Sequence, residues 1–426
     1  MQTDLTPELE SSADGAEAQA IVRKCVHCGF CNATCPTYQV LGDELDGPRG
    51  RIYLIKQVLE GAQVTRSTQV HLDRCLTCRN CETTCPSGVE YGHLVEIGRK
   101  LVDAKVERPI GERAVRWALK EGMTSPAFAP AVRAGQAVRP LLPAVLKKNV
   151  PLRETRPAAE ALARPRAPSP AGGATARNEP PPARRTVLLL QGCVQPALMP
   201  GIDDAAERVM RRAGIEVIRV RASCCGAVRS HLGDPEGGRE HMRANIEAWT
   251  PLLSSGSADA VVTSASACTL AIKEYGHALA ADPDYRDRAE RIGALARDLS
   301  ELLPEIVAAL APEIDGKRFG RLAYHPPCTL QHGQRLRGGV ETALREVGFD
   351  VRVAPRDANL CCGSAGTYSV LQPVLANELR DRKVRDLGEV EPACIVSSNM
   401  GCIRHLQSGT STPVRHWIEV LDDALA

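Results

Sequence analysis

The sequence predicts a mixed α and α/β protein, in which an α-helical N-terminal domain precedes two duplicated α/β domains. Three observations lead to this prediction: a cysteine-rich run that occurs twice near the N-terminus, a proline-rich segment, and a strand–helix pattern that is repeated in the second half of the chain. The 426 residues suffice for about two to four domains that each bury a core of their own.

Composition and charge narrow the function classes. The chain has 53 Lys plus Arg against 51 Asp plus Glu, which gives no basis for nucleic-acid binding. Its apolar runs are far shorter than the roughly 18 residues that a membrane span needs. The first 20 residues are acidic and polar, unlike a secretory signal, so we expect a cytoplasmic protein. Thiols stay reduced in the cytoplasm, where clustered cysteines more often bind metal than form disulfides.

The two N-terminal cysteine runs carry the clearest chemical signal. Both read C-x2-C-x2-C-x3-C-P, the spacing that binds [4Fe–4S] clusters in ferredoxins, where the fourth cysteine ligates the neighbouring cluster. We therefore expect one cluster on Cys25, Cys28, Cys31 and Cys85, and a second on Cys75, Cys78, Cys81 and Cys35. A four-cysteine zinc site is the alternative, but it needs neither the Cys-Pro tail nor a second copy in crossed register.

Helical patterns surround these runs. Apolar residues recur at helical spacing in 51–60 and 93–102, so the cysteines are embedded in helices, as in the α-helical ferredoxin domains of respiratory enzymes. We expect this ferredoxin-like domain to span residues 15–105, with a helical extension over 106–150 that contains a helix near 112–121. Eight prolines among the 35 residues of 151–185 predict an extended Pro/Ala/Arg-rich linker.

Two repeats follow the linker, over 186–315 and 316–426. Each reads strand, helix, strand, Cys-Cys-Gly, helix, strand and Cys, and equivalent cysteines are offset by 135, 137 and 134 residues. Alternating strands and helices predict a small parallel sheet in each repeat, with the cysteines in loops at the strand ends. The candidate cofactor-binding residues are Cys193, Cys224, Cys225, Cys268, Cys328, Cys361, Cys362 and Cys402. The alternative is that these thiols only pack, as we expect for Cys394.

Together these features resemble the iron–sulfur subunits of glycolate oxidases, above all in the stretch Asp43-Glu-Leu-Asp-Gly-Pro-Arg-Gly-Arg-Ile-Tyr-Leu-Ile-Lys56. The resemblance implies an electron-transfer subunit of a glycolate dehydrogenase complex. FAD-binding partner subunits would oxidise glycolate to glyoxylate, and electrons would leave toward a membrane quinone. The chain itself would have no catalytic site for glycolate, and it carries no G-x-G-x-x-G fingerprint of a dinucleotide site. A peripheral position at the inner face of the cell membrane follows from the quinone acceptor.

Related families leave alternatives open. The same layout occurs in iron–sulfur subunits of lactate and glycerol-3-phosphate dehydrogenase complexes and in the heterodisulfide reductase group, where the repeats serve thiol and disulfide chemistry. In that last group each repeat ends in Cys-x-x-Cys, but here Ala265 and Asn399 occupy the first position of the pair. Two [4Fe–4S] clusters are therefore expected, and additional clusters in the repeats are an open alternative.

Overall fold

A computed structural model describes residues 1–141, 185–220 and 223–425. The predicted linker, apart from Arg185, and the end of the predicted helical extension lie outside these described residues. By spatial contacts the chain divides into two compact units. The first unit comprises Met1–Arg116, Pro326–Leu336 and Arg356–Asp386, and the second comprises Trp117–His325, Arg337–Pro355 and Leu387–Ala426. These two units are defined by spatial contacts and do not coincide with the two sequence repeats. The domain boundaries expected from the sequence therefore stay a prediction.

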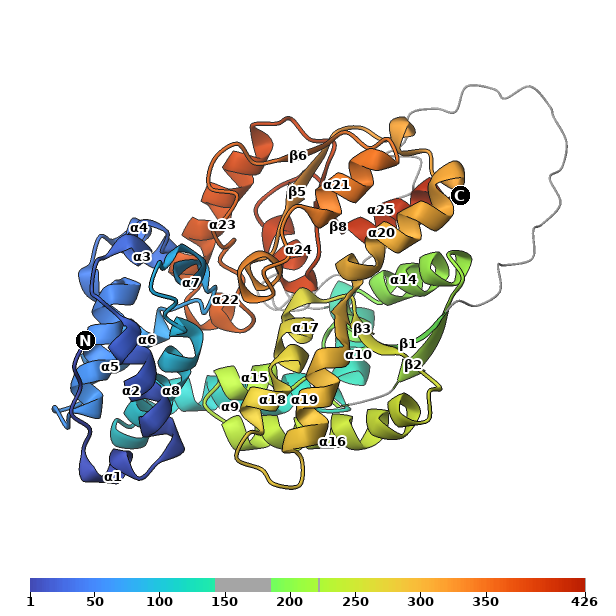
Figure 1. Cartoon of the computed structure of the whole chain (residues 1–426). Coiled ribbons are helices and arrows are strands. Elements are labelled where there is room, and N and C mark those ends of the chain that lie inside the picture. The colour runs from blue at the N-terminus through green and yellow to red at the C-terminus, as the bar shows by residue number, and fades with distance from the viewer. Residues whose placement is uncertain (142–184, 221–222, 426) are drawn as a thin grey trace, which may run out of the picture. The chain divides into compact units, whose positions relative to one another are not determined.

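The first unit is built from helices (Figure 1). Pro48 begins α5, where its missing N–H costs no hydrogen bond, and the apolar stripe Ile52, Ile55 and Leu59 is buried against α8. The helices are α1 (Pro7–Glu10), α2 (Ala13–Lys24), α3 (Phe30–Ala33), α4 (Pro36–Leu41), η1 (Glu44–Asp46), α5 (Pro48–Leu59), α6 (Arg66–Asp73), α7 (Asn80–Thr84), α8 (Tyr91–Lys105), η5 (Thr329–Gly333) and α22 (Tyr368–Leu371). Helices α9 (Ile110–Thr124) and α23 (Pro373–Gly388) each cross a unit limit.

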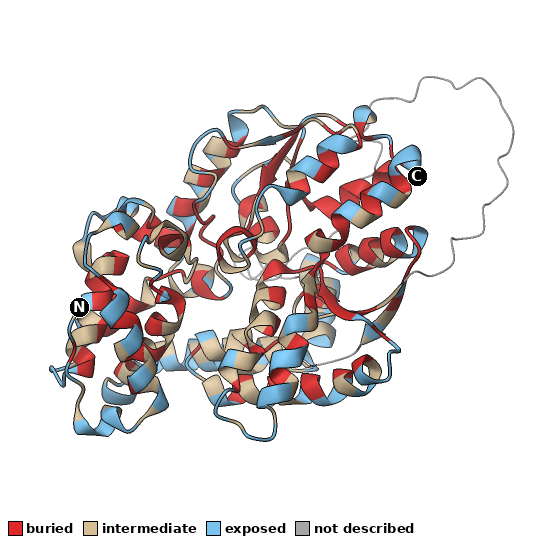
Figure 2. Cartoon of the chain, in the orientation of Figure 1, coloured by how far each residue is buried: buried red, intermediate tan, exposed pale blue. Residues whose placement is uncertain are grey.

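The second unit contains two parallel sheets of four strands each. Their orders are β2-β1-β3-β4 and β6-β5-β7-β8, so both repeats have the same topology. Most residues of these strands are buried, as their apolar runs predict for parallel sheets that helices cover on both faces (Figure 2). The strands are β1 (Arg185–Leu190), β2 (Ile215–Val220), β3 (Ala260–Thr263), β4 (Ala296–Asp298), β5 (Leu322–His325), β6 (Val351–Val353), β7 (Cys394–Ser397) and β8 (Val414–His416).

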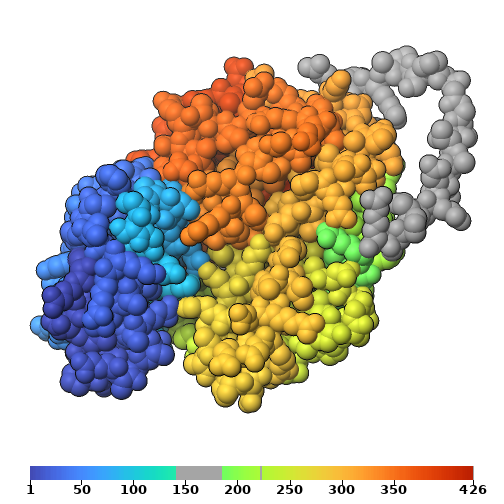
Figure 3. Space-filling view, viewed as in Figure 1, coloured from blue at the N-terminus to red at the C-terminus, as the bar shows by residue number. Residues whose placement is uncertain are grey.

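Helices complete each repeat of the second unit. The first repeat forms one continuous packed body, seen in green through yellow in Figure 3. The helices are α10 (Phe128–Val138), η2 (Arg139–Leu141), α13 (Gln195–Leu198), α14 (Gly201–Arg212), α15 (Ala227–His231), α16 (Pro235–Ser254), α17 (Ser266–Lys273), α18 (Tyr275–Ala278), α19 (Arg286–Leu295), α20 (Leu299–Leu310), η3 (Ala311–Glu313), η4 (Gly316–Arg318), α21 (Gly339–Glu346), α24 (Met400–Gln407) and α25 (Trp417–Ala424).

The two repeats exchange helix contacts reciprocally. A helix between the first two strands of one repeat packs on the helix that follows the last strand of the other, since α14 contacts α25 and α21 contacts α20. In both repeats the last strand ends in the residue that caps the last helix, Asp298 for α20 and His416 for α25. This arrangement is that of a duplicated domain, and the predicted fold class is confirmed. Among the described residues, no helix combines the length and the hydropathy that crossing a bilayer requires.

Candidate metal centres

The two N-terminal cysteine runs fold into matching turns. His27 and Thr77 have φ of 60° and 50°, and Gly29 and Arg79 have φ of 86° and 58°. Left-handed residues that alternate with ordinary ones turn successive backbone N–H groups toward one side, which makes a concavity suited to an anion. Gly29 and Arg79 then cap the one-turn helices α3 and α7. A cluster held by four thiolates is such an anion.

The first run and Cys85 line an open cavity at the surface of the first unit, with about 430 Å³ of empty space that includes solvent at its mouth. Its wall contains Cys25, Cys28, Cys31 and Cys85, the four residues predicted to share one cluster. Cys28 is exposed, and the neighbouring Val26 and Phe30 are 69% and 63% exposed. The structure therefore brings this set together close to solvent.

A second open cavity, with about 300 Å³ of empty space that includes solvent at its mouth, contains the other predicted set in its wall: Cys35, Cys75, Cys78 and Cys81. Three of these thiols are buried and Cys78 is half-buried. Cys81 and Tyr91 line both cavities, so the two share a wall. Each cavity thus gathers three cysteines of one run and the last cysteine of the other run, which is the crossed arrangement of two-cluster ferredoxins.

The protonation of these thiols also fits a multi-metal group. Burial and the neighbouring Cys25 raise the pKa of Cys31 to about 11. Burial together with neighbouring thiols raises the pKa of Cys78 and Cys81 well above the usual value. Thiols crowded in this way do not ionise together unless metal cations balance their charge. The donor set and its electrostatics therefore fit [4Fe–4S] clusters.

Cysteines of the second repeat lie beside the second cavity, within the same unit. Cys328 and Cys361 pack in one apolar cluster with Leu76 and Cys78, and the Sγ atoms of Cys328 and Cys361 are 3.9 Å apart. Cys328 directly precedes η5, and Cys361 belongs to the Cys-Cys-Gly loop. This cluster places the second repeat's thiols next to one N-terminal site.

Three hydrogen bonds fix that arrangement. The Thr83 hydroxyl is 2.9 Å from Nδ1 of His332, and Tyr368 donates to the carbonyl of Arg74 at 3.1 Å. Asn359 Nδ2 donates to Asn80 Oδ1 at 3.5 Å. Each bond joins an N-terminal segment to the second repeat, so the two sets of cysteines are held by the same framework.

In the first repeat, all four candidate cysteines converge inside the second unit. The Sγ atoms of Cys193 and Cys224 are 3.4 Å apart, and the neighbouring thiols of Cys224 and Cys268 raise the pKa of Cys225. The contact between Cys193 and Cys224 lowers the pKa of Cys224 and raises that of Cys193. One negative charge is thus stabilised in a group of four sulfurs, the donor set that a soft metal prefers.

Buried polar side chains hold this loop. Asn245 Nδ2 donates to the carbonyl of Cys224 at 2.9 Å, and the Tyr275 hydroxyl donates to the carbonyl of Cys225 at 3.2 Å. Gly226 has φ of 92°, the left-handed conformation expected at this position, and so does Gly363 with φ of 90°. These contacts orient the two adjacent thiols without occupying their sulfurs.

The last cysteine of each repeat is located differently from the prediction. Cys268 and Cys402 lie in the first turns of α17 and α24 rather than in loops. Asn399 caps α24, because its side chain accepts a hydrogen bond from the N–H of Gly401 at 3.1 Å. The helix therefore begins at the position where related repeats carry a further cysteine, and the cap explains the asparagine.

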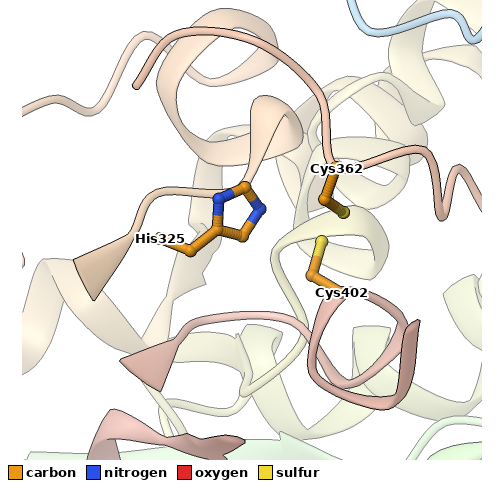
Figure 4. Close-up of side chains that lie close together, drawn as sticks. All are labelled: His325, Cys362 and Cys402. Carbon is orange, nitrogen blue, oxygen red and sulfur yellow. The ribbon is translucent and has the colours of Figure 1, made fainter. Parts of the chain in front are cut away.

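His325 is a candidate ligand that the sequence pattern did not reveal. It ends β5, is 1% exposed, and has a ring nitrogen within 4.8 Å of the Sγ of Cys402 in the second unit (Figure 4). Figure 4 also labels Cys362, which follows Cys361 in the first unit. Cys394, by contrast, is fully buried at the start of β7, and burial raises its pKa to about 12, as befits a packing residue.

Models of known protein families match the segments of the chain that contain these cysteine sites. Residues 21–89 match the family model described as a 4Fe-4S dicluster domain, and residues 187–273 and 322–407 each match the model described as a cysteine-rich domain. The class is therefore an iron–sulfur protein with two [4Fe–4S] clusters and two cysteine-rich domains, part of an oxidoreductase.

Relatives identify the family within that class. The chain is 49% identical to the glycolate oxidase iron–sulfur subunit of Escherichia coli (strain K12), over the whole chain and 99% of the relative. It is 28% identical to the probable glycolate oxidase iron–sulfur subunit of Bacillus subtilis (strain 168), over 90% of the chain and 88% of that protein. Lactate utilization protein A of Geobacillus thermodenitrificans is 27% identical over 55% of the chain and 98% of its own length. The chain belongs to the family of glycolate oxidase iron–sulfur subunits.

Proposed function

We propose that this chain is the electron-transfer subunit of a glycolate-oxidising complex. FAD-binding partner subunits oxidise glycolate to glyoxylate, and electrons pass through this chain toward a membrane quinone. The chain is cytoplasmic and attaches peripherally to the inner face of the cell membrane through its partners. The full-length similarity to a glycolate oxidase iron–sulfur subunit supports this assignment over a lactate complex, whose relative aligns with about half of the chain.

One observation carries the proposal: within the first unit, the cysteine sites are contiguous. The first cavity includes the exposed Cys28 and shares Cys81 with the second cavity, where three of the four thiols are buried. Cys78 of the second cavity packs in turn with Cys328 and Cys361. Electron transfer between cofactors requires such closeness, whereas catalysis on a 2-hydroxy acid does not.

The eight N-terminal cysteines are proposed to bind two clusters in different surroundings. Cys25, Cys28, Cys31 and Cys85 hold one cluster near solvent, and Cys75, Cys78, Cys81 and Cys35 hold the other in the interior. Each cluster accepts and releases one electron at a time. Three of the four thiols around the second cavity are buried, whereas Cys28 of the first set is exposed, so solvent reaches the two clusters to different extents and their potentials differ. The protein thus holds its clusters in fixed positions and gives them different surroundings.

We infer that the repeats hold further redox-active metal. Their eight cysteines form two sets, Cys193, Cys224, Cys225 and Cys268, and Cys328, Cys361, Cys362 and Cys402. The convergence of the first set, and the location of Cys328 and Cys361 beside Cys78, support this role. A cluster on the second repeat would extend the series of sites by one more step.

Reconstitution tests the assignment. The purified chain alone should not oxidise glycolate, and adding the flavin subunits should restore glycolate-dependent reduction of a quinone analogue. The Cys78→Ser variant should bind the flavin subunits but fail to pass electrons on, because the interior cluster is lost. Oxidation of glycolate by the chain alone would overturn the proposal. Faster reduction by lactate or glycerol 3-phosphate than by glycolate would assign the complex to another substrate.

A further inference from the structure

A buried ion-pair network lies against the second cavity, and cluster ligation does not require it. The side chains of Arg51 and Asp46 are 1% and 0% exposed, and Arg51 Nη2 is 3.3 Å from Asp46 Oδ1. Arg74 Nη1 is 2.8 Å from Asp46 Oδ2, and His71 Nδ1 is 3.1 Å from Oδ1 of the same carboxylate. One buried carboxylate therefore faces two guanidinium groups, and the network carries an excess of positive charge.

The stretch that resembles the glycolate oxidase family builds this network. Asp46 ends η1, Pro48 begins α5, and Arg51 follows one turn later. Gly50 is essential to the tight corner, because a Cβ there would lie 2.1 Å from the carbonyl oxygen of Glu44. The corner directs both charged side chains inward, where Arg51 Nε also donates to the carbonyl of His71 at 2.7 Å.

Burial of this pair is not explained by stability. Removing two charges from water is unfavourable, and well-packed apolar residues of similar size often fold as well or better. A buried pair next to a redox site can serve instead to set the electrostatic potential there. The location of the pair relative to the cysteine sulfurs decides between these roles.

Arg51 reaches the second cavity together with two hydroxyl groups. Arg51, Thr37 and Tyr91 all line that cavity. Arg51 Nη1 donates to the Thr37 hydroxyl at 3.1 Å, and that hydroxyl is 3.3 Å from the Sγ of Cys35. The carbonyl of Asp46, at 2.8 Å, is a second acceptor for the single proton of this hydroxyl, which a ligating Cys35 thiolate can only accept. The Tyr91 hydroxyl donates to the Sγ of Cys75 at 3.6 Å. Two sulfurs of the second set are thus contacted from one side by polar groups.

The first cavity has a different environment. Its arginine, Arg49, is 31% exposed and forms an ion pair with Glu44 at 2.6 Å, which is 40% exposed. Solvent screens this pair, whereas it does not reach the pair of Arg51 and Asp46, although Arg74 at the edge of that network is 32% exposed. Ser87 stands two residues after Cys85, at the position that Thr37 holds after Cys35.

We propose that Arg51, Thr37 and Tyr91 are positioning residues that raise the reduction potential of the second cluster above that of the first. Reduction adds one electron, and hence one negative charge, to a group that is already anionic. A fixed guanidinium and hydroxyl donors directed at its sulfurs stabilise the added charge. Electrons that enter at the exposed first cluster then move inward in the favourable direction. The proposal rests on the proposed assignment of Cys35 and Cys75 to the second cluster.

The test is an anaerobic redox titration of the purified full chain, followed by EPR. Tyr91→Phe and Thr37→Val remove one hydroxyl each, and each should lower the midpoint potential of a single cluster while iron content stays at the wild-type value. The signal that Cys78→Ser abolishes identifies that cluster as the second. Arg51→Gln should lower the same potential further, and Arg51→Lys should restore part of the loss because it keeps the charge.

Matched variants near the first cavity serve as controls. Ser87→Ala and Arg49→Gln should leave the potential of the second cluster unchanged. If Arg51→Gln does not fold, Tyr91→Phe and Thr37→Val still test the proposal, because each removes one hydroxyl and keeps the buried charges. Unchanged potentials in both Tyr91→Phe and Thr37→Val, with full iron content, would overturn the proposal. Because the titration uses the chain without its partners, failure of glycolate-dependent reduction would contradict the proposed function and leave this result intact.

Discussion

Single glycines determine how closely the backbone folds behind the adjacent cysteines of each repeat. A Cβ on Gly226 would lie 2.8 Å from the carbonyl oxygen of Gly238, and one on Gly363 would lie 2.5 Å from that of Ala376. Both glycines also have left-handed φ, which costs other residues roughly 1–2 kcal/mol. We expect Gly226→Ala to lower the free energy of unfolding by about 2 kcal/mol or more, measured by thermal unfolding.

Gly256 provides the control for that substitution. It has φ of 74° in the same unit, but no atom lies within 4 Å of the Cβ that alanine would add. Gly256→Ala should therefore show only the conformational cost, about 1 kcal/mol. Equal losses in the two variants would mean that close packing behind the Cys-Cys pair contributes nothing.

The role of the repeat cysteines can be read from the iron content of single variants. Cys225→Ala removes a thiol that contacts Cys224 and Cys268, and it should remove the iron of the first repeat while both N-terminal clusters remain. Cys394→Ala changes a fully buried cysteine of β7 and should keep all the iron. The measurement is iron and acid-labile sulfide per chain, with roughly twelve to sixteen irons expected for the wild type. About eight irons, unchanged in Cys225→Ala, would confine clusters to the N-terminal sites.

At the scale of elements, the cap of α25 makes the second unit sensitive to acid. His416 accepts a hydrogen bond from the N–H of Ile418 at 3.1 Å through Nδ1, while Nε2 is 3.0 Å from the carbonyl of Ser264. Burial lowers the pKa of His416 to about 3, although the hydrogen bonds to Ser264 and Ser398 act in the opposite direction. The folded state thus requires a neutral imidazole that joins one repeat to the cap of the other.

The sign of the pH effect follows from that depressed pKa. The unfolded chain binds a proton near pH 6.5, but the folded chain does not, so stability is present above that pH and falls as the solution is acidified toward pH 3. Between pH 7 and 5 the loss should be on the order of 2 kcal/mol. His416→Asn keeps a helix cap without a titrating ring, and should flatten this slope in pH-dependent thermal unfolding. A slope equal to that of the wild type would exclude His416 as its origin.

Local sequence patterns predict most of these elements but not all. The apolar runs around Val187 and Val217 form β1 and β2, and the apolar stripe after Arg51 belongs to α5, as predicted. Each pattern is long and apolar enough that burial of its apolar side chains determines the secondary structure. The fourth strands escaped prediction, since β4 and β8 have three residues each and include charged side chains. Cys268 and Cys402 were expected in loops, but strand-to-helix junctions with few connecting residues place them in helices.

At the scale of the whole molecule, the spacing of cysteines predicts which of them lie together only within the duplicated N-terminal run. The two crossed sets of four follow from the duplicated run, and the structure gathers each set around its own cavity. No local signal indicates that Cys328 and Cys361 pack with Cys78, since that contact spans some 250 residues. The same holds for Arg51 and Tyr91, whose approach to Cys35 and Cys75 depends on how α5 and α8 pack.

Under the proposed function, the exposed cysteine set around the first cavity also predicts where the electron donor binds. Val26 and Phe30 project apolar side chains into solvent on either side of the exposed Cys28, and all three line the first cavity. Exposed apolar groups of this size next to a redox site favour a protein partner, which would exclude water as it docks. We expect Phe30→Asp to raise, by about tenfold, the concentration of chain needed for half-maximal glycolate-dependent electron transfer by the reconstituted complex, which corresponds to about 1.4 kcal/mol.

A second exposed valine separates docking from a general effect of charge. Val374 on α23 is 81% exposed and belongs to the same unit, but it does not line either cavity. Val374→Asp should leave the half-maximal concentration unchanged, and Val26→Asp should raise it as Phe30→Asp does. All three variants should keep the wild-type EPR spectrum, because none removes a ligand. If Val374→Asp weakened the complex and the two loop variants did not, the flavin partner would dock elsewhere, and electrons would have to enter the chain at a site other than the first cluster.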